Sequence, residues 1–173
     1  KTQQTGAIDA AIFKFVDGVI ADKKKSVKVV EKALEMKLVA LVIASEIEKE
    51  KEEAEQDKSF GEKAEALFAQ LLDGKYSADL KKLVYQLRLQ SLNPQSPAPE
   101  DVAKIEDVAK RLLKEEDEQL QALGIAVKGQ LLIQAAQKDP KAVPALDKYA
   151  DEVLEQAKKN PAVKTQGVGM KIQ

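Results

Sequence analysis

Apolar residues recur along most of the chain at the spacing of one helix face, and no segment alternates in the way a strand does. The first predicted helix spans about residues 7–21 and carries apolar side chains three or four positions apart. This spacing predicts that they all face the core. They are Ile8, Ala11, Ile12, Phe15, Val16, Val19 and Ile20.

The second predicted helix, residues 26–56, is apolar on two sides over its first two thirds. We therefore expect residues 36–44 at the centre of a helical bundle. Residues 46–58 contain mostly Glu and Lys, so this last part is expected to extend beyond the core or to fray. One apolar side consists of Val27, Val30, Leu34, Leu38 and Leu41, and the other of Val29, Ala33, Met36, Ala40, Ile43 and Ile47.

Serine residues mark the expected starts of the next two helices. Ser59 followed by Glu62 has the spacing of a capping box and predicts a helix to residue 73. Ser77 is expected to cap a fourth helix that ends near residue 92. Because the turn between these two helices is short and contains Gly74, we expect them to be antiparallel neighbours.

A proline-rich segment, residues 93–99, is the clearest linker in the chain. Prolines 94, 97 and 99 lack backbone donors and favour an extended conformation. We interpret the segment as a crossover between two halves of one bundle, because neither half is convincingly self-sufficient. A domain boundary is the alternative.

The helical pattern then continues from residue 100 to residue 138, through Gly124 and Gly129. We predict one continuous or mildly bent helix here, and two helices are the alternative. A last helix is expected from about Pro144 to residue 160, followed by a flexible tail, residues 161–173. The predicted fold is an all-α antiparallel, up-down bundle of five or six helices in a single domain, residues 1–160.

The composition excludes many chemistries, since the chain contains 0 His and 0 Cys. Without imidazole or thiolate groups, the usual zinc, iron and copper sites and the common nucleophile–base pairs cannot form. We therefore predict no enzyme, no catalytic residue, no cofactor and no metal site. A net charge of -1 argues against nucleic acid as a partner. No apolar stretch reaches the roughly 18 residues needed to span a membrane.

Two features are candidates for binding a partner. The lysines Lys23, Lys24, Lys25 and Lys28 form a basic cluster that could contact a protein or an anionic membrane surface, although a solvated loop is the simpler interpretation. Tyr85 lies off the main apolar face of its helix and is the candidate aromatic contact, with a half-buried core tyrosine as the alternative. The acidic residues between Glu46 and Asp57 are interpreted as a solvated helix end, since no Ca²⁺-loop spacing organises them.

These observations favour a non-catalytic helical-bundle interaction or accessory protein that binds a protein partner, with a membrane or envelope assembly as one setting. The alternative is a carrier of an apolar ligand or lipid in a helical cavity that includes Met36. A chain without Cys fits reducing and oxidising compartments equally. The polar segment at residues 1–5 shifts our expectation slightly towards an exported protein, and a cytoplasmic one is the alternative.

Overall fold

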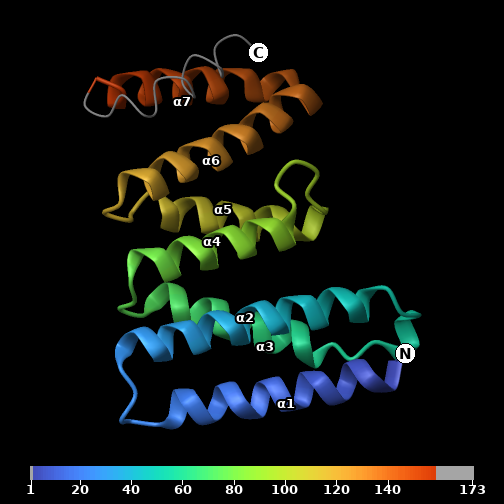
Figure 1. Cartoon of the computed structure of the whole chain (residues 1–173). Coiled ribbons are helices and arrows are strands. Elements are labelled where there is room, and N and C mark those ends of the chain that lie inside the picture. Colours follow the sequence, from blue (N-terminus) through green and yellow to red (C-terminus); the bar gives the residue numbers. More distant parts are fainter. Residues whose placement is uncertain (1, 159–173) are drawn as a thin grey trace. The chain divides into compact units, whose positions relative to one another are not determined.

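Every regular element in residues 2–158, the part of the chain that the structure describes, is a helix, which confirms the all-α prediction (Figure 1). The computed structural model has seven α-helices there, so the expected five or six were too few. Side chains are described from residue 10 onward, and the predicted tail at 161–173 lies outside the described residues. The helices are α1 (Thr2–Ala21), α2 (Val27–Lys49), α3 (Ser59–Asp73), α4 (Ala78–Leu92), α5 (Val102–Leu112), α6 (Glu118–Lys138) and α7 (Val143–Gln156).

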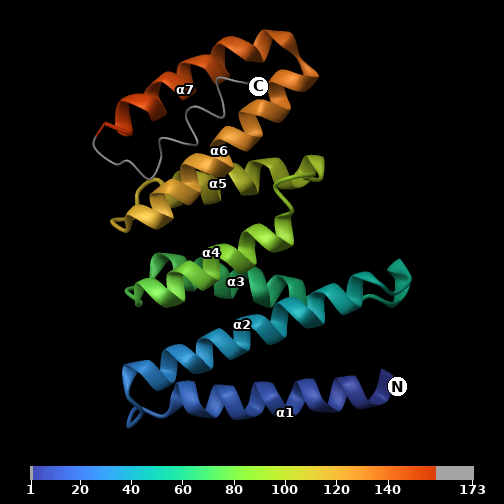
Figure 2. The same cartoon turned by 45° about the horizontal axis from the view of Figure 1, so that its top comes forward.

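The contacts between helices divide the chain into two compact units, one ending at Arg88 and one beginning at Leu89. The division falls inside α4 and not in the proline-rich segment 93–99. Within each unit, consecutive helices pack together: α1 on α2 and α2 on α3, then α5 on α6 and α6 on α7. Figure 1 and Figure 2 both show α1 and α2 as neighbours. A single up-down bundle over residues 1–160 stays a prediction.

The core of the first unit is built on one side of α2. The leucines on this side form one buried cluster with apolar residues of α3 and α4. On each helix the members of the cluster are three or four positions apart, so they share one face. The buried members are Leu34, Leu38, Leu41, Ala64, Leu67, Phe68, Leu71, Leu80 and Val84.

The other apolar side of α2 is covered only in part: Ala33 is buried, whereas the larger side chains of this side are exposed. Met36 is 44% exposed and Ile43 is 54% exposed, so the expectation that residues 36–44 lie at the centre of a bundle is wrong for these two side chains. On α1, Val16 is fully buried, but Phe15 is 66% exposed. A helix that packs on one neighbour buries a narrow strip, and Phe15 lies outside that strip although it belongs to the predicted face.

The loop between α2 and α3 shortens α2 relative to the prediction. The helix ends at Lys49 and not near residue 56. The Glu48 carboxylate accepts a hydrogen bond from the backbone N–H of Asp57 at 2.9 Å, so the loop folds back onto the end of the helix. Asp57 in turn accepts from the backbone N–H of Ser59 at 2.9 Å. The expected capping box is therefore wrong: Ser59 is already helical, and Asp57 satisfies its N–H.

The Ser77 cap is confirmed. Its hydroxyl oxygen accepts from the backbone N–H of Leu80 at 3.3 Å. Ser77 is also bound to α2: the Glu31 carboxylate accepts a hydrogen bond from the Ser77 backbone N–H at 2.8 Å and another from the Ser77 hydroxyl at 2.7 Å. This contact fixes the α3–α4 turn against the beginning of α2.

In the second unit, the predicted continuous helix over 100–138 is two helices, α5 and α6. Asp117 begins α6 as its N-cap, and its carboxylate accepts from the backbone N–H groups of Gln119 and Leu120. The glycines are not the break, since Gly124 lies inside α6. A Cβ at Gly124 would be 2.8 Å from the Leu112 Cβ, so glycine here allows α6 to approach the end of α5 closely.

The proline-rich segment is anchored within the second unit. Asn93, at the end of α4, adopts a positive φ of 43°, a conformation that Asn tolerates better than most residues. The Gln134 amide of α6 donates to the carbonyl oxygens of Pro94 and Gln95, each at 2.9 Å. Further along, α6 and α7 share a core of Ile125, Leu146, Tyr149, Ala150 and Val153.

Two neighbouring residues of α2 test the assignment of its faces. Leu41→Ala should lower the free energy of unfolding by about 2–5 kcal/mol, because it leaves a cavity in the core. Ile43→Ala should change it by less than about 0.5 kcal/mol, since Ile43 is largely exposed. Chemical denaturation monitored by circular dichroism measures both values. Equal losses would mean that the exposed side of α2 is covered in solution.

Two glycines inside helices provide a second test. Gly124→Ala should destabilise the protein by about 1–3 kcal/mol, because the new methyl group collides with α5. Gly18→Ala should stabilise it by about 0.5–1 kcal/mol, since no atom lies within 4 Å of the added Cβ and Ala favours helix. Thermal and denaturant unfolding measure the two shifts. A stabilising Gly124→Ala would contradict the close packing of α5 on α6.

Candidate functional site

A pocket in the first unit lies between α1, α2 and α3. Its volume is about 450 Å³. Apolar side chains form its walls, with a few charged and amide groups among them, which is the usual character of a small-ligand site. The lining residues are Phe13, Asp17, Lys37, Leu41, Phe60, Lys63, Ala66, Leu67 and Gln70.

Two aromatic rings from helices far apart in sequence meet in this pocket. The ring centroids of Phe13 on α1 and Phe60 on α3 are 6.2 Å apart, and the ring planes are inclined by 25°. Both side chains also pack against the core of the unit. The sequence pattern did not single out either residue, although Phe13, Val16 and Ile20 share the helical spacing of Val16's buried side.

The charged groups of the pocket are unequally paired. Lys37 Nζ donates to the Asp17 carboxylate at 2.6 Å, so these two charges balance each other. Lys63 Nζ lies 5.5 Å from the centroid of the Phe60 ring and 3.4 Å from the Ser59 hydroxyl oxygen. Its charge also helps to lower the pKa of Asp57, which does not line the pocket. The lining therefore carries one ammonium group beyond the Lys37–Asp17 pair.

A second feature, the exposed apolar side of α2, is here named the α2 stripe and consists of Val29, Met36, Ile43 and Ile47. Each of these side chains is exposed. Val29, Met36 and Ile43 are seven positions apart, so they lie almost in line along the helix. This is the spacing with which helices pack against other helices.

The four predicted lysines lie at one end of this stripe. Lys23, Lys24 and Lys25 belong to the loop between α1 and α2, and Lys28 lies in the first turn of α2. All four are exposed. Lys25 Nζ is 3.8 Å from the Asp22 carboxylate, a weak surface pair. The structure thus brings the basic cluster next to Val29.

The structure places Tyr85 inside the protein, which corrects the sequence interpretation. Its side chain is 1% exposed, so it cannot serve as a surface contact in this conformation. Tyr76 is half-buried against the core of the first unit. Tyr149 is buried in the second unit, where its hydroxyl donates to the Ile125 carbonyl at 3.4 Å and Lys128 Nζ lies 4.1 Å from its ring centroid.

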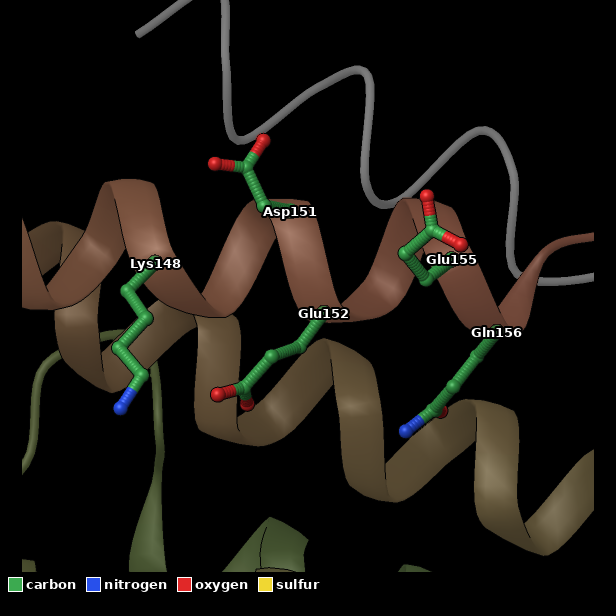
Figure 3. Close-up of a pocket in the computed structure, with 5 residues that line it drawn as sticks. All are labelled: Lys148, Asp151, Glu152, Glu155 and Gln156. Carbon is green, nitrogen blue, oxygen red and sulfur yellow. The ribbon is translucent and has the colours of Figure 1, made fainter.

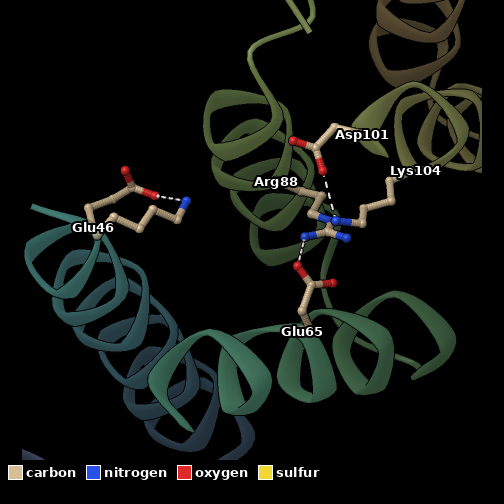
Figure 4. A network of polar contacts seen from close by, with 6 residues as sticks. Glu46, Glu65, Arg88, Asp101 and Lys104 are labelled. Atoms are coloured by element: carbon tan, nitrogen blue, oxygen red, sulfur yellow. Dashed lines mark hydrogen bonds and ion pairs between the residues drawn. The ribbon is translucent and has the colours of Figure 1, made fainter. Parts of the chain in front are cut away.

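Within the acidic segment from Glu46 to Asp57, Glu46, Glu48 and Asp57 form local pairs and turns. Lys49 pairs with Glu46 at 2.8 Å (Figure 4). Lys51 pairs with Glu48 at 2.5 Å. Hydrogen bonds from the backbone of Asp57 and from Lys51 lower the pKa of Glu48. The backbone N–H and hydroxyl of Ser59 lower the pKa of Asp57. No group of three or more acidic side chains that could hold a metal ion occurs among the described residues.

One buried charge was not anticipated from the sequence. Arg88 of α4 is 8% exposed and forms an ion pair with Glu65 of α3 (Figure 4). The Arg88 guanidinium also lies 5.1 Å from the Phe68 ring centroid. Burial of a guanidinium group is tolerated where a carboxylate and an aromatic face receive it. Arg88 thus joins α4 to α3.

A depression of about 700 Å³ on the surface of α7 has a different character. The described residues that line it all belong to this helix: Lys148, Asp151, Glu152, Glu155 and Gln156. Lys148, Glu152 and Gln156 extend to one side of the helix, whereas Asp151 and Glu155 extend to the other (Figure 3). Because these groups do not converge on a common point, they form no candidate site.

The comparisons with known proteins add no relative. No protein-family model, no curated protein and no solved structure matches this chain. Among the described residues, no helix is both long enough and apolar enough to cross a membrane. The argument for function therefore depends on the pocket and the α2 stripe.

Tyr149 offers a test of the second unit by titration. Burial raises the pKa of the Tyr149 hydroxyl to about 12, and the nearby Glu152 carboxylate adds to this increase. The neutral form is favoured in the folded state, so its contribution to stability is complete below the ordinary pKa of 10 and is lost as the pH rises towards 12. Absorbance at about 295 nm should show a late tyrosine step that Tyr149→Phe removes. Loss of an early step instead would contradict the burial.

Proposed function

We propose that this protein is a non-catalytic interaction protein that binds a helical segment of a partner protein along the α2 stripe. The observation that carries the proposal is the exposure of an aligned apolar row on a helix whose opposite side forms the core. Soluble proteins seldom expose such rows unless another molecule covers them. An amphipathic helix is the partner element whose own apolar row has the same period.

The surroundings of the stripe support a protein as the occupant. The side of α2 that carries Met36 and Ile43 points away from the buried Leu38 and Leu41, so it is accessible to another polypeptide. The basic cluster at the beginning of α2 favours an acidic residue at the matching end of the partner helix.

The lack of a catalytic arrangement supports a binding role. The chain contains 0 His and 0 Cys, and Glu46, Glu48 and Asp57 are engaged in local pairs and turns. The residues that gather in the α1–α2–α3 pocket lack the base and nucleophile pair that acyl or group transfer uses. Binding, not turnover, is the function that these side chains suit.

Site-specific photo-crosslinking tests the proposal. A benzophenone amino acid at position 36 should form an adduct with one other polypeptide in cells of the source organism, and the added change Ile43→Glu should abolish it. The matched control is the same probe at position 143, together with Val143→Glu, because Val143 is also an exposed apolar residue, at 42%. The control probe should give no such adduct, and Val143→Glu should leave the adduct at position 36 intact.

Two outcomes would contradict the proposal. Crosslinking only to a second copy of the chain would make the stripe a self-association surface. Flotation of the protein with vesicles containing phosphatidylserine, lost on Ile43→Glu but retained in Val143→Glu, would make it a membrane-binding surface that uses the same lysines.

A further inference from the structure

We infer that the α1–α2–α3 pocket is a binding site for a small amphipathic carboxylate, with its apolar part against Phe13 and Phe60 and its carboxylate at Lys63. This inference is independent of the proposed partner binding, because no residue of the α2 stripe lines the pocket. Met36, which the sequence placed in a ligand cavity, lies on the stripe and not in the pocket.

The size and walls of the pocket suit a small apolar body. A volume of about 450 Å³ lies within the range of about 300–1,000 Å³ that is usual for small-molecule sites. Leu41 and Leu67 supply aliphatic surface at its base, where the core of the unit holds them in place. The Phe13 and Phe60 rings are stacked on each other, with their planes inclined by 25°, and both residues line the pocket, so together they form its aromatic wall.

The charged side chains that line the pocket determine what charge a ligand should carry. Asp17 and Lys37 neutralise each other at 2.6 Å, which leaves the Lys63 ammonium group as the net charge of the lining. A monocarboxylate matches this single charge. A positively charged ligand would be repelled by Lys63, and the lining has no unpaired carboxylate to attract it. A second negative charge on the ligand would have no further ammonium group as a partner, because Lys37 is already paired with Asp17.

The position of Lys63 fits a ligand with two different ends. Its Nζ atom lies 5.5 Å from the Phe60 ring centroid, so the cation is next to the aromatic wall and not across the pocket from it. A ligand whose ring packs against the aromatic wall of Phe13 and Phe60 can therefore reach Lys63 with a carboxylate attached directly to that ring. Gln70 lies seven positions after Lys63, about two turns further along α3; it also lines the pocket and supplies an amide group.

Titration of the full chain with 1-naphthoate, followed by ¹H–¹⁵N NMR, tests the inference. Amide signals around Phe13, Lys37, Phe60 and Lys63 should shift in a saturable way. Lys63→Gln should weaken binding about threefold to tenfold, as expected for one partly exposed ion pair. The matched control is Lys110→Gln, which removes the same charge from an exposed position on α5 and should leave the affinity unchanged.

A neutral ligand and a variant of the α2 stripe distinguish binding in this pocket from binding to a non-specific apolar surface. The neutral analogue 1-naphthylmethanol should bind the wild-type protein about as weakly as 1-naphthoate binds Lys63→Gln, and Ile43→Glu should not affect naphthoate binding. Equal binding of the two ligands, equal effects of Lys63→Gln and Lys110→Gln, or loss of binding in Ile43→Glu would each overturn the inference. Circular dichroism of every variant verifies that the fold is retained.

Discussion

The first unit depends on the packing of the α2 leucines against α3 and α4. Leu34, Leu38 and Leu41 follow one another along a single side of α2, and each is buried. The free energy of this contact comes from removing large aliphatic side chains from water, and it positions three helices at once. Because consecutive residues of a helix point about 100° apart, the same contact directs Lys37 into the pocket and leaves Met36 and Ile43 on the surface. The core, the pocket and the stripe are three sides of one helix.

Polar contacts hold the segments that the apolar core leaves undetermined. Glu31 receives two hydrogen bonds from Ser77, which ties the α3–α4 turn to α2. Glu48 and Asp57 together close the loop that leads into α3. In the second unit, Gln134 binds two carbonyl groups of the proline-rich segment. Each contact satisfies backbone groups that lie outside the helices, where side chains and water are the available partners. Placement of α3, and with it Phe60 and Lys63, therefore depends on a few acidic side chains.

The two binding features call for different ligands because their surroundings differ. The α2 stripe is linear, exposed and bordered by lysines, which suits an extended partner surface such as a helix. The pocket is concave, contains two aromatic rings and has one ammonium group in excess, which suits a small anion with an apolar body. A substitution in one feature leaves the other intact, so the two proposals can fail or succeed separately.

The sequence by itself determined that the chain is helical, where α3 and α4 lie, and which chemistries are excluded, since helix periodicity, turn residues and missing residue types are local properties. Asp117, Asp57 and the fold-back at Glu48 were missed because their effect depends on which backbone N–H each carboxylate reaches. The sequence showed that α2 has two apolar sides, but it did not show which of them is buried. Only tertiary structure decided that the Leu41 side is buried and the Ile43 side exposed, that Phe13 and not Phe15 packs against the core, and that Tyr85 is inside. Periodicity shows which residues share a face, whereas burial depends on how many neighbouring helices are present to cover it.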